Sequence, residues 1–381
     1  MNIRGILQKR REKFNTFNLI TIDARRLENN LDILRSIAGM EMIPVLKSNA
    51  YGHGIREVAS ILEKLQVKTV AVDGYFEALQ IHRIFSGKIL VLSVIDRKNV
   101  GLLKNRRISY VLQNEEDLRA FGKLRRKINV HLELNTGMNR LGLKLTEVDN
   151  YLKTLKKYKN LHLEGVMTHL ASADEARNNT PEKQTAEFDA AVEKILAAGF
   201  APTYFHIANS AGAGRIKSKF ANAARAGIGM YGINHLEKAD KRFNEFAKLR
   251  PVLQLESTII KVIDLKKGDE ISYGGSFTAG KNMRVGVLPL GYYEGVPRDL
   301  SSRGIVSLNK QELAIVGRVN MNHTIIDLTE TDLKPGDKVT VISKDPNMKN
   351  SVIGLQQTFG LFAYETLARL SEHARKKVVY N

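Results

Sequence analysis

Short apolar runs alternate with longer amphipathic segments along residues 43–232, and no other feature restricts the fold of the chain as strongly. The runs have the length and the aliphatic content of buried strands. Eight of them occur, at residues 43–46, 69–72, 89–94, 109–112, 129–134, 161–168, 203–207 and, more weakly, 226–230. The segments between them show helical spacing, as at 55–65 and 185–198. In the second of these, Phe188, Val192, Ile195 and Leu196 form one apolar stripe.

Eight strands that alternate with helices predict an α/β fold, a (β/α)8 barrel of the TIM type. The competing interpretation is a doubly wound open sheet. The barrel is favoured because no glycine-rich dinucleotide fingerprint follows any of the early strands.

The pattern changes after about Arg250. Strand-like segments follow at 253–263, 284–289, 304–308, 313–316, 324–328 and 338–342, and turn sequences such as Lys-Lys-Gly-Asp and Lys-Pro-Gly-Asp separate them. This predicts a mostly antiparallel β domain, with a helix at 354–362. We therefore expect three parts: a basic N-terminal extension with its leading strand at 1–21, a barrel at 22–249 and a β domain at 250–381.

Composition excludes several classes of function. The 381 residues include no cysteine, so thiolate catalysis, thiolate metal sites and disulfides are excluded. The net charge of +19 suggests nucleic-acid binding. The basic residues, as at 153–159 and 119–127, have helix-like spacing beside apolar positions, which is typical of solvated helix faces. No nucleic-acid motif, signal peptide or membrane-length apolar run occurs, so we expect a cytoplasmic protein without a nucleic-acid, membrane or metal partner.

The catalytic groups of a parallel barrel come from the carboxyl ends of its strands. The polar residues expected there are Lys47 after the first strand, Glu133 and Arg140 after the fifth, His169 after the sixth, Asn209 and Ser210 after the seventh, and Arg225 at the start of the eighth. Partial burial would lower the pKa of the Lys47 amine and make it nucleophilic, although a lone lysine at a strand end more often only reaches for solvent.

A phosphate site is expected beside Lys47. Ser210 precedes a glycine-rich stretch at 211–214, and Gly227 and Ile228 fall in the eighth predicted strand, where barrels commonly bind phosphate. An ordinary turn would explain the glycines alone. With Lys47 at the same barrel mouth, a cofactor that carries an aldehyde and a phosphate explains both features. His169 is either a structural histidine or a hydrogen-bond relay near Arg225, and Glu133 with Arg140 can position a substrate carboxylate.

The residues resemble the alanine racemase family along nearly the whole chain. The segment Val-Leu-Lys-Ser-Asn-Ala-Tyr-Gly-His-Gly at 45–54 is similar to the family's cofactor-lysine motif, and Ser-Tyr-Gly-Gly-Ser-Phe-Thr-Ala at 272–279 is similar to the segment that bears its second catalytic base. Further similar segments, in the family's order, lie at 22–31, 135–142, 167–174, 206–212, 225–232, 288–295, 316–322 and 364–367.

The resemblance implies a pyridoxal 5'-phosphate (PLP) dependent isomerase that racemises L- and D-alanine with two bases and supplies D-alanine for bacterial cell-wall peptidoglycan. Lys47 would hold the cofactor as a Schiff base and act on one face of the substrate, and Tyr273 would act on the other. The further implied binding residues are Tyr51, His169, Asn209, Ser210, Arg225, Gly227, Ile228 and Tyr364 for the cofactor, and Arg140, Met321 and Tyr292 for the substrate. A homodimer is implied, in which Tyr273 and Met321 complete the partner's site.

The chain departs from the family pattern at several positions. Glu133 stands where many members have a carbamylated lysine, and further departures are Asn135, Ala226, Asn320 and Asn322. These put the substrate range in question, so a racemase for serine or a basic amino acid is an alternative. More distant alternatives are a PLP-barrel decarboxylase, a non-catalytic PLP-binding protein and a nucleic-acid-binding protein.

Overall fold

The computed structural model describes residues 15–103 and 107–380. The basic stretch predicted within residues 1–14 lies outside this range. The described chain divides into two compact units, one of residues 24–250 and the other of residues 15–23 together with 251–380. Within this range, no helix combines the length and the apolar character required to cross a membrane.

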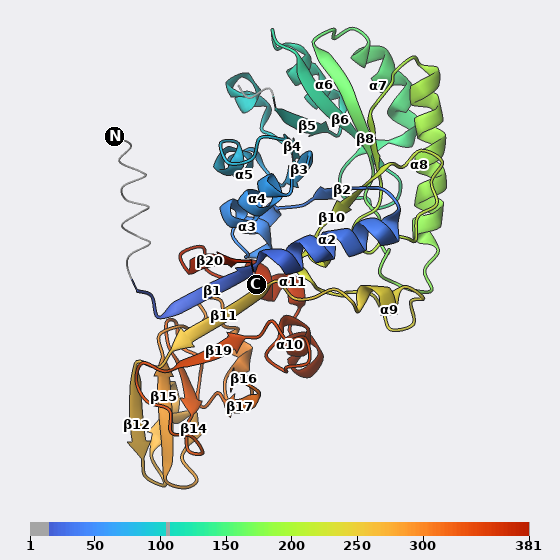
Figure 1. Ribbon diagram of the computed structural model, residues 1–381. Coiled ribbons are helices and arrows are strands. Elements are labelled where there is room, and N and C mark those ends of the chain that lie inside the picture. Colours follow the sequence, from blue (N-terminus) through green and yellow to red (C-terminus); the bar gives the residue numbers. More distant parts are fainter. Residues whose placement is uncertain (1–14, 104–106, 381) are drawn as a thin grey trace. The chain divides into compact units, whose positions relative to one another are not determined.

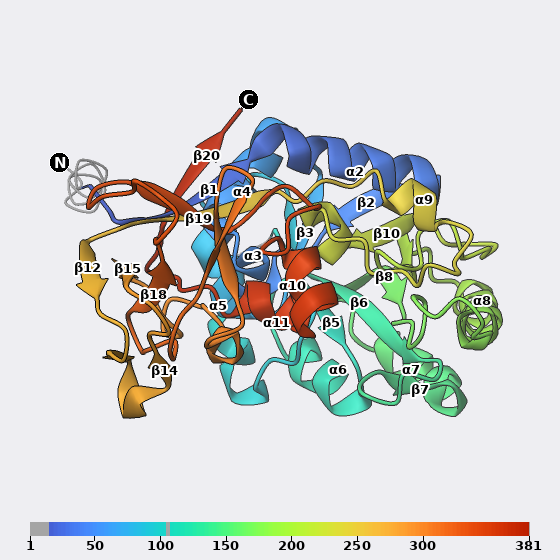
Figure 2. The same cartoon turned by 90° about the horizontal axis from the view of Figure 1, so that it is seen from below.

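Residues 24–250 form the predicted barrel. Eight strands pair in parallel in the order β2-β10-β9-β8-β6-β5-β4-β3, and a parallel bridge between Val45 and Ala71 joins the first to the last. Figure 2 shows α2, α6, α7 and α8 outside these strands. The strands are β2 (Glu41–Pro44), β3 (Thr69–Val72), β4 (Lys88–Val91), β5 (Ile108–Leu112), β6 (Ile128–Asn135), β8 (Leu161–Met167), β9 (Tyr204–His206) and β10 (Ala223–Ala226). The predicted fold class is therefore confirmed.

The helices of the barrel turn one apolar face toward the strands. In α4 the buried side chains Ile55, Val58 and Leu62 recur at helical spacing, and in α6 the Asn114 side chain caps the first turn by accepting from the Asp117 N–H at 2.8 Å. Leu196, predicted to belong to the apolar stripe of α8, is partly exposed instead. The helices are α2 (Ala24–Ala38), α4 (Ile55–Lys64), α5 (Tyr75–Ile81), α6 (Glu115–Gly122), α7 (Val148–Leu155), α8 (Thr180–Ala197) and the short α9 (Phe243–Phe246).

The eighth strand was predicted at the wrong place. It comprises Ala223–Ala226, so Arg225 lies inside the strand, and Gly227 and Ile228 lie beyond it. The apolar residues that follow form a 3₁₀ helix, η3 (Ile228–Tyr231). The prediction failed because the strand consists of three alanines and an arginine, which carry little β-propensity, whereas the neighbouring apolar run resembles a strand.

The second unit consists mainly of antiparallel sheets, as predicted. Its largest sheet has the order β17-β16-β19-β11-β1-β20, in which β1 (Asn18–Asp23) pairs antiparallel with β11 (Leu253–Thr258) and parallel with β20 (Arg375–Val379). Figure 1 shows β1 beside β11. The predicted strand 253–263 is in fact two strands, since the chain leaves the sheet after β11 and begins β12 (Lys261–Leu265) in another sheet.

The remaining elements of this unit form two smaller sheets and two helices. A three-stranded sheet has the order β12-β15-β18, and β13 pairs with β14. A small core of Ile271, Val285 and Val316 lies within this part. The bounds are β13 (Glu270–Ile271), β14 (Phe277–Thr278), β15 (Met283–Leu288), β16 (Ile305–Leu308), β17 (Gln311–Ala314), β18 (Thr324–Asp327), β19 (Lys338–Ile342), α10 (Val352–Phe359) and α11 (Ala363–Ala368).

Asn30 on α2 connects the first helix of the barrel to the backbone at its end. Its fully buried side chain accepts from the Arg250 N–H at 2.9 Å and donates to the Arg250 and Met230 carbonyls at 2.9 and 3.1 Å. We expect Asn30→Ala to lower the free energy of unfolding by about 2–3 kcal/mol, because it leaves these buried groups without partners. Urea unfolding measures the change, with the exposed neighbour Asn29→Ala as the control. Equal stability of the two variants would contradict this role.

Candidate active site

A left-handed turn places Lys47 at the mouth of the barrel. Lys47 follows β2 and opens α3 (Lys47–Tyr51), in which the next four residues, Ser48 to Tyr51, have φ between 51 and 55°. This backbone conformation costs about 1–2 kcal/mol for each L-residue. Two contacts hold the turn: Glu77 accepts from the Ser48 N–H at 2.7 Å, and Asn49 accepts from the Ile55 N–H at 2.8 Å. Backbone strain of this kind clusters at functional sites.

The environment of Lys47 lowers the pKa of its amine. Burial lowers the pKa of the Lys47 amine, and the positive charges of Arg140 and Arg225 lower it further, against the opposing effect of Asp73. An amine with a lowered pKa is more often unprotonated near neutral pH and can attack a carbonyl carbon. The direction of this shift is the one expected for Lys47 from the sequence.

Arg225 is buried inside the barrel, with 3% of its surface exposed. Its Nη1 donates to the His206 carbonyl at 2.6 Å and to His206 Nδ1 at 3.0 Å. Its Nη2 donates to the Thr168 carbonyl at 2.8 Å and to His169 Nδ1 at 3.2 Å. Burial lowers the pKa of Arg225 to about 10, so the side chain still carries its charge at neutral pH. Strand-end carbonyls and two imidazoles therefore replace water around this cation.

His169 is fixed as a neutral hydrogen-bond donor. Burial and the neighbouring Arg225 lower the pKa of His169 to about 3. An arginine only donates, so Nδ1 of His169 accepts and Nε2 carries the hydrogen. A neutral His169 in contact with Arg225 is compatible with the predicted role of a hydrogen-bond relay.

A buried polar chain continues from Arg225 across neighbouring strands to Glu164. His206 Nε2 lies 2.8 Å from His131 Nδ1, and His131 Nε2 lies 3.5 Å from Glu164 Oε2. Since His206 Nδ1 accepts from Arg225, each neutral imidazole carries its hydrogen on Nε2 and donates toward Glu164. The carboxylate also accepts from Ser109 at 2.6 Å and pairs with Lys88. These hydrogen bonds outweigh the effect of burial and lower the pKa of Glu164 to about 2.

Ser210, Gly227 and Tyr51 form a cradle that suits an anion. The Gly227 and Gly229 N–H groups donate to Ser210 Oγ at 2.9 and 3.3 Å, which leaves the Ser210 hydroxyl hydrogen to donate elsewhere. A Cβ at Gly227 would lie 2.9 Å from Tyr51 Oη, so any larger residue there would have to displace this hydroxyl. Asn209 shapes the same loop by accepting from the Gly212 N–H at 2.9 Å.

Glu133 and Arg140 are arranged differently from the expectation. Glu133 lies inside β6 and not in the loop after it, and it accepts from Gln113 Nε2 at 2.8 Å. Burial raises the pKa of Glu133, against the opposing charges of Arg225 and Arg140. Arg140 lies in the exposed loop beyond the strand, where Asn135 shapes the backbone by accepting from the Asn139 N–H at 3.0 Å.

The second unit brings three other predicted residues together. The Tyr292 N–H donates to the Asn320 carbonyl at 3.0 Å, next to Met321. Ser272, which precedes Tyr273, has its hydroxyl 3.1 Å from Asn320 Oδ1. Asn320 is one of the positions at which the chain departs from the family pattern. Its side chain binds the turn that carries Tyr273, and its backbone directly precedes Met321. Tyr273 is 73% exposed and Met321 is 55% exposed.

Tyr364 lies in α11 of the same unit, and its ring stacks on Phe362 with 5.1 Å between centroids. A pocket of about 480 Å³ in this unit is lined by Tyr292, Phe362 and Arg298, among others. The predicted residues thus fall into two groups, one at the barrel mouth and one in the second unit.

His131, His206 and Glu164 were not predicted as site residues from the sequence. These residues occupy three different strands, so no sequence spacing relates them. The available signal was a polar side chain within an otherwise apolar strand run, which marks a group that must find a buried partner.

Comparisons with known proteins agree with this architecture. A model of the alanine racemase N-terminal domain matches residues 22–235, and one of the C-terminal domain matches residues 252–378. An alanine racemase of Citrifermentans bemidjiense is 33% identical, with 94% of this chain and 98% of that protein covered. Among solved structures, an alanine racemase of Clostridium difficile 630 has a TM-score of 0.89 at 26% identity, with 97% of each chain covered. One of Bacillus anthracis with bound L-Ala-P has a TM-score of 0.87 at 28% identity, with 97% of this chain and 96% of that chain covered.

Glu164 predicts a pH-dependent contribution to stability. Its pKa in the folded protein, about 2, is below the ordinary 4.5, so its stabilisation is complete above pH 4.5 and is lost as the pH falls toward 2. We expect Glu164→Gln to lower the free energy of unfolding by about 3 kcal/mol at pH 6, and the deficit to shrink in acid. Urea unfolding between pH 3 and 7 measures it, with the exposed Glu187→Gln on α8 as the control. A deficit that does not vary with pH would contradict the assignment.

Proposed function

The chain belongs to the alanine racemase family, and we propose that it interconverts L-alanine and D-alanine with PLP bound at the mouth of its barrel. One observation carries the proposal: Lys47, an amine of lowered pKa, shares the barrel mouth with the buried cation Arg225 and with the anion cradle of Ser210 and Gly227. An aldehyde, a ring nitrogen and a phosphate each find a matching group there.

The residues present fit this cofactor. Lys47 would bind its aldehyde carbon, Arg225 would donate to its ring nitrogen, and Tyr51, Ser210, Gly227, Ile228 and Tyr364 would hold its phosphate, with Asn209 shaping the loop. The fit is supported by the space at Gly227, which a Cβ would fill. When bound, PLP supplies an electron-withdrawing system that makes the substrate Cα–H acidic. Because Arg225 can only donate, the nitrogen that it faces would accept and remain unprotonated.

Racemisation requires a proton to leave one face of Cα and another to arrive on the opposite face. We assign the two faces to Lys47 and Tyr273, with Lys47 acting on D-alanine and Tyr273 on L-alanine as the family resemblance implies. The phenol of tyrosine, with an ordinary pKa near 10, needs stabilisation of its anion to act as a base. The His169 Nε2–H, oriented by the charged Arg225, is suited to donate to that oxygen.

A homodimer would complete the site. Tyr273 and Met321 are exposed in the single chain and are held together by the contacts of Asn320, so they can be presented jointly to a partner's barrel. Arg140 and the Met321 N–H would then bind the substrate carboxylate. Tyr292 would narrow the entrance, which favours alanine over serine or a basic amino acid. The role of D-alanine in peptidoglycan and the cytoplasmic location stay predictions from the resemblance.

A chiral assay tests the proposal directly. The purified protein with PLP should form D-alanine from L-alanine faster than it racemises L-serine or L-lysine. Lys47→Ala should abolish the reaction, because it removes both the attachment point and one base, whereas the exposed Lys153→Ala on α7 should not change it. Faster turnover of serine or lysine would replace alanine as the substrate. Absence of turnover with all three, despite bound cofactor, would refute the racemase assignment.

The second base has its own test. Tyr273→Phe should retain the absorbance of the bound cofactor but lower the racemisation rate at least about 100-fold, because it removes one proton donor and acceptor while keeping the ring. Tyr158→Phe, in the turn that follows α7, serves as the control. A rate within a few fold of the unmodified enzyme would exclude Tyr273 as a base.

A further inference from the structure

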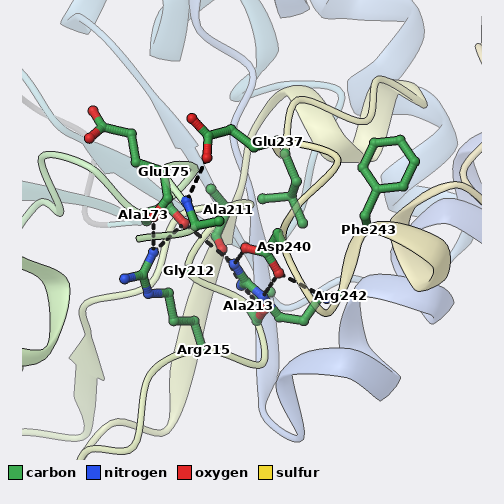
Figure 3. Close-up of polar contacts among 12 residues, drawn as sticks. Ala173, Glu175, Ala211, Gly212, Ala213, Arg215, Glu237, Asp240, Arg242 and Phe243 are labelled. Carbon is green, nitrogen blue, oxygen red and sulfur yellow. Dashed lines mark hydrogen bonds and ion pairs between the residues drawn. The ribbon is translucent and has the colours of Figure 1, made fainter. Parts of the chain in front are cut away.

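Two arginines hold the loops behind the anion cradle. Figure 3 shows Arg242 and Arg215 among the backbone carbonyls of two loops, one that follows β8 (residues 168–179) and one that follows β9 (residues 207–222). Arg215 donates to the carbonyls of Ala173 and Glu175 at 3.2 and 2.8 Å. Arg242 also reaches the Ala173 carbonyl, at 3.4 Å. Neither arginine belongs to the sites predicted from the sequence.

Arg242 contacts the turn that carries Ser210. Its Nη1 donates to the Ala211 carbonyl and, at 2.8 Å, to the Ala213 carbonyl. The turn is otherwise closed by weak or local contacts, such as the Ala213 N–H to the Ser210 carbonyl at 3.3 Å. Arg242 binds both carbonyls, and Asn209 accepts from the Gly212 N–H at 2.9 Å, so these two side chains together orient the peptide planes of the turn.

Asp240 fixes the direction of Arg242. The carboxylate accepts from Arg242 Nε at 2.9 Å and from Nη2 at 2.5 Å, and it also accepts from the Arg242 N–H at 2.8 Å. The two side chains are only 12% and 7% exposed. A bidentate pair of this kind leaves the remaining guanidinium hydrogens in a fixed plane, here directed at the turn. The positive charge of Arg242 also neutralises the buried carboxylate of Asp240, which would otherwise repel an anion bound in the cradle.

We propose that Arg242, oriented by Asp240, is a positioning residue for the phosphate of the cofactor. By holding the turn at 210–213, it keeps the Ser210 hydroxyl, which accepts from the Gly227 N–H, in the position from which it donates to the phosphate. It acts through the turn and does not touch the cofactor. The inference rests on the proposed function, because it assumes that PLP occupies the cradle.

The phosphate is the part of the cofactor that should respond to this contact. Loss of Arg242 would leave the Ala211 and Ala213 carbonyls and the Asp240 carboxylate without their charged donor. The turn would then be free to rotate Ser210 away from its glycine partners. Lys47 and Arg225 lie on other elements, so the binding of the aldehyde and of the ring should change little.

The test compares two ligands that differ only in the phosphate. Dissociation constants of the apo-enzyme for PLP and for pyridoxal, which lacks the phosphate, are measured by absorbance titration for the unmodified protein and for Arg242→Met. The dissociation constant for PLP should rise roughly tenfold or more, as expected for loss of charge-assisted hydrogen bonds, while that for pyridoxal changes less than about threefold. The ratio of the two constants is the readout.

Arg107→Met is the matched control. Arg107 also donates to two backbone carbonyls, those of Phe85 and His82 at 2.8 and 2.5 Å, but it directly precedes β5 at the opposite, amino-terminal end of the strands. We expect it to lower thermal stability without changing the ratio. If Arg242→Met does not fold, Asp240→Asn provides the milder test, since it keeps the shape of the side chain and should shift the ratio in the same direction.

The outcomes are distinct. A larger PLP-to-pyridoxal ratio in Arg242→Met or Asp240→Asn, with no change in Arg107→Met, supports the proposal. Equal weakening of both ligands, or an unchanged ratio, overturns it and leaves Arg242 as a residue of general stability. If the unmodified protein binds neither ligand at Lys47, or binds pyridoxal as tightly as PLP, the proposed cofactor itself is wrong.

Discussion

The burial of one guanidinium determines much of the barrel interior. Arg225 lies inside β10, where water cannot solvate it, so carbonyls at the ends of the neighbouring strands and two imidazoles must face it. Because arginine only donates, it sets the hydrogen of both histidines, and through His206 it sets that of His131. A chain of hydrogen bonds thereby joins the Arg225 guanidinium to the buried Glu164 carboxylate through His206 and His131. Every donor in this chain points toward Glu164. Burial, together with the charge of Arg225, lowers the pKa of Lys47 and keeps His169 neutral.

Side chains near the candidate chemistry are held mostly through the backbone that carries them. Lys47 is displayed by a left-handed turn, Ser210 by a turn whose carbonyls face Arg242, and Tyr273 by a turn that contacts Asn320. Each turn is anchored by polar side chains that do not themselves belong to the predicted site. A site on loops can therefore be as well ordered as one on regular strands, provided that the loops have such anchors.

Helices and strands are predicted best from the sequence where an apolar run can be buried in only one kind of secondary structure. The strands at 69–72 and 338–342 coincide with β3 and β19, because runs rich in valine and isoleucine have little alternative to a buried strand. The prediction fails at β10, where small residues carry no pattern, and at Ser48–Tyr51, where four residues without glycine adopt positive φ. Lys47, Arg225 and Ser210 could be found by their place at strand ends. His131, His206 and Glu164 could not, since they lie on three different strands. Arg242 could not either, since the Ala211 and Ala213 carbonyls that it binds are about 30 residues away, although Asp240 is close in the chain.

The strand order of the second unit has a consequence for the time course of biosynthesis. β1 is made before any part of the barrel, yet its sheet neighbours β11 and β20 begin only at Leu253 and Arg375. At roughly 5–20 residues per second, the ribosome needs on the order of ten seconds or more to deliver the first of them. During that interval the whole barrel sequence emerges while an apolar strand waits with both edges open. The largest sheet of the second unit can therefore be completed only after the whole barrel sequence and the C-terminal strand have been made.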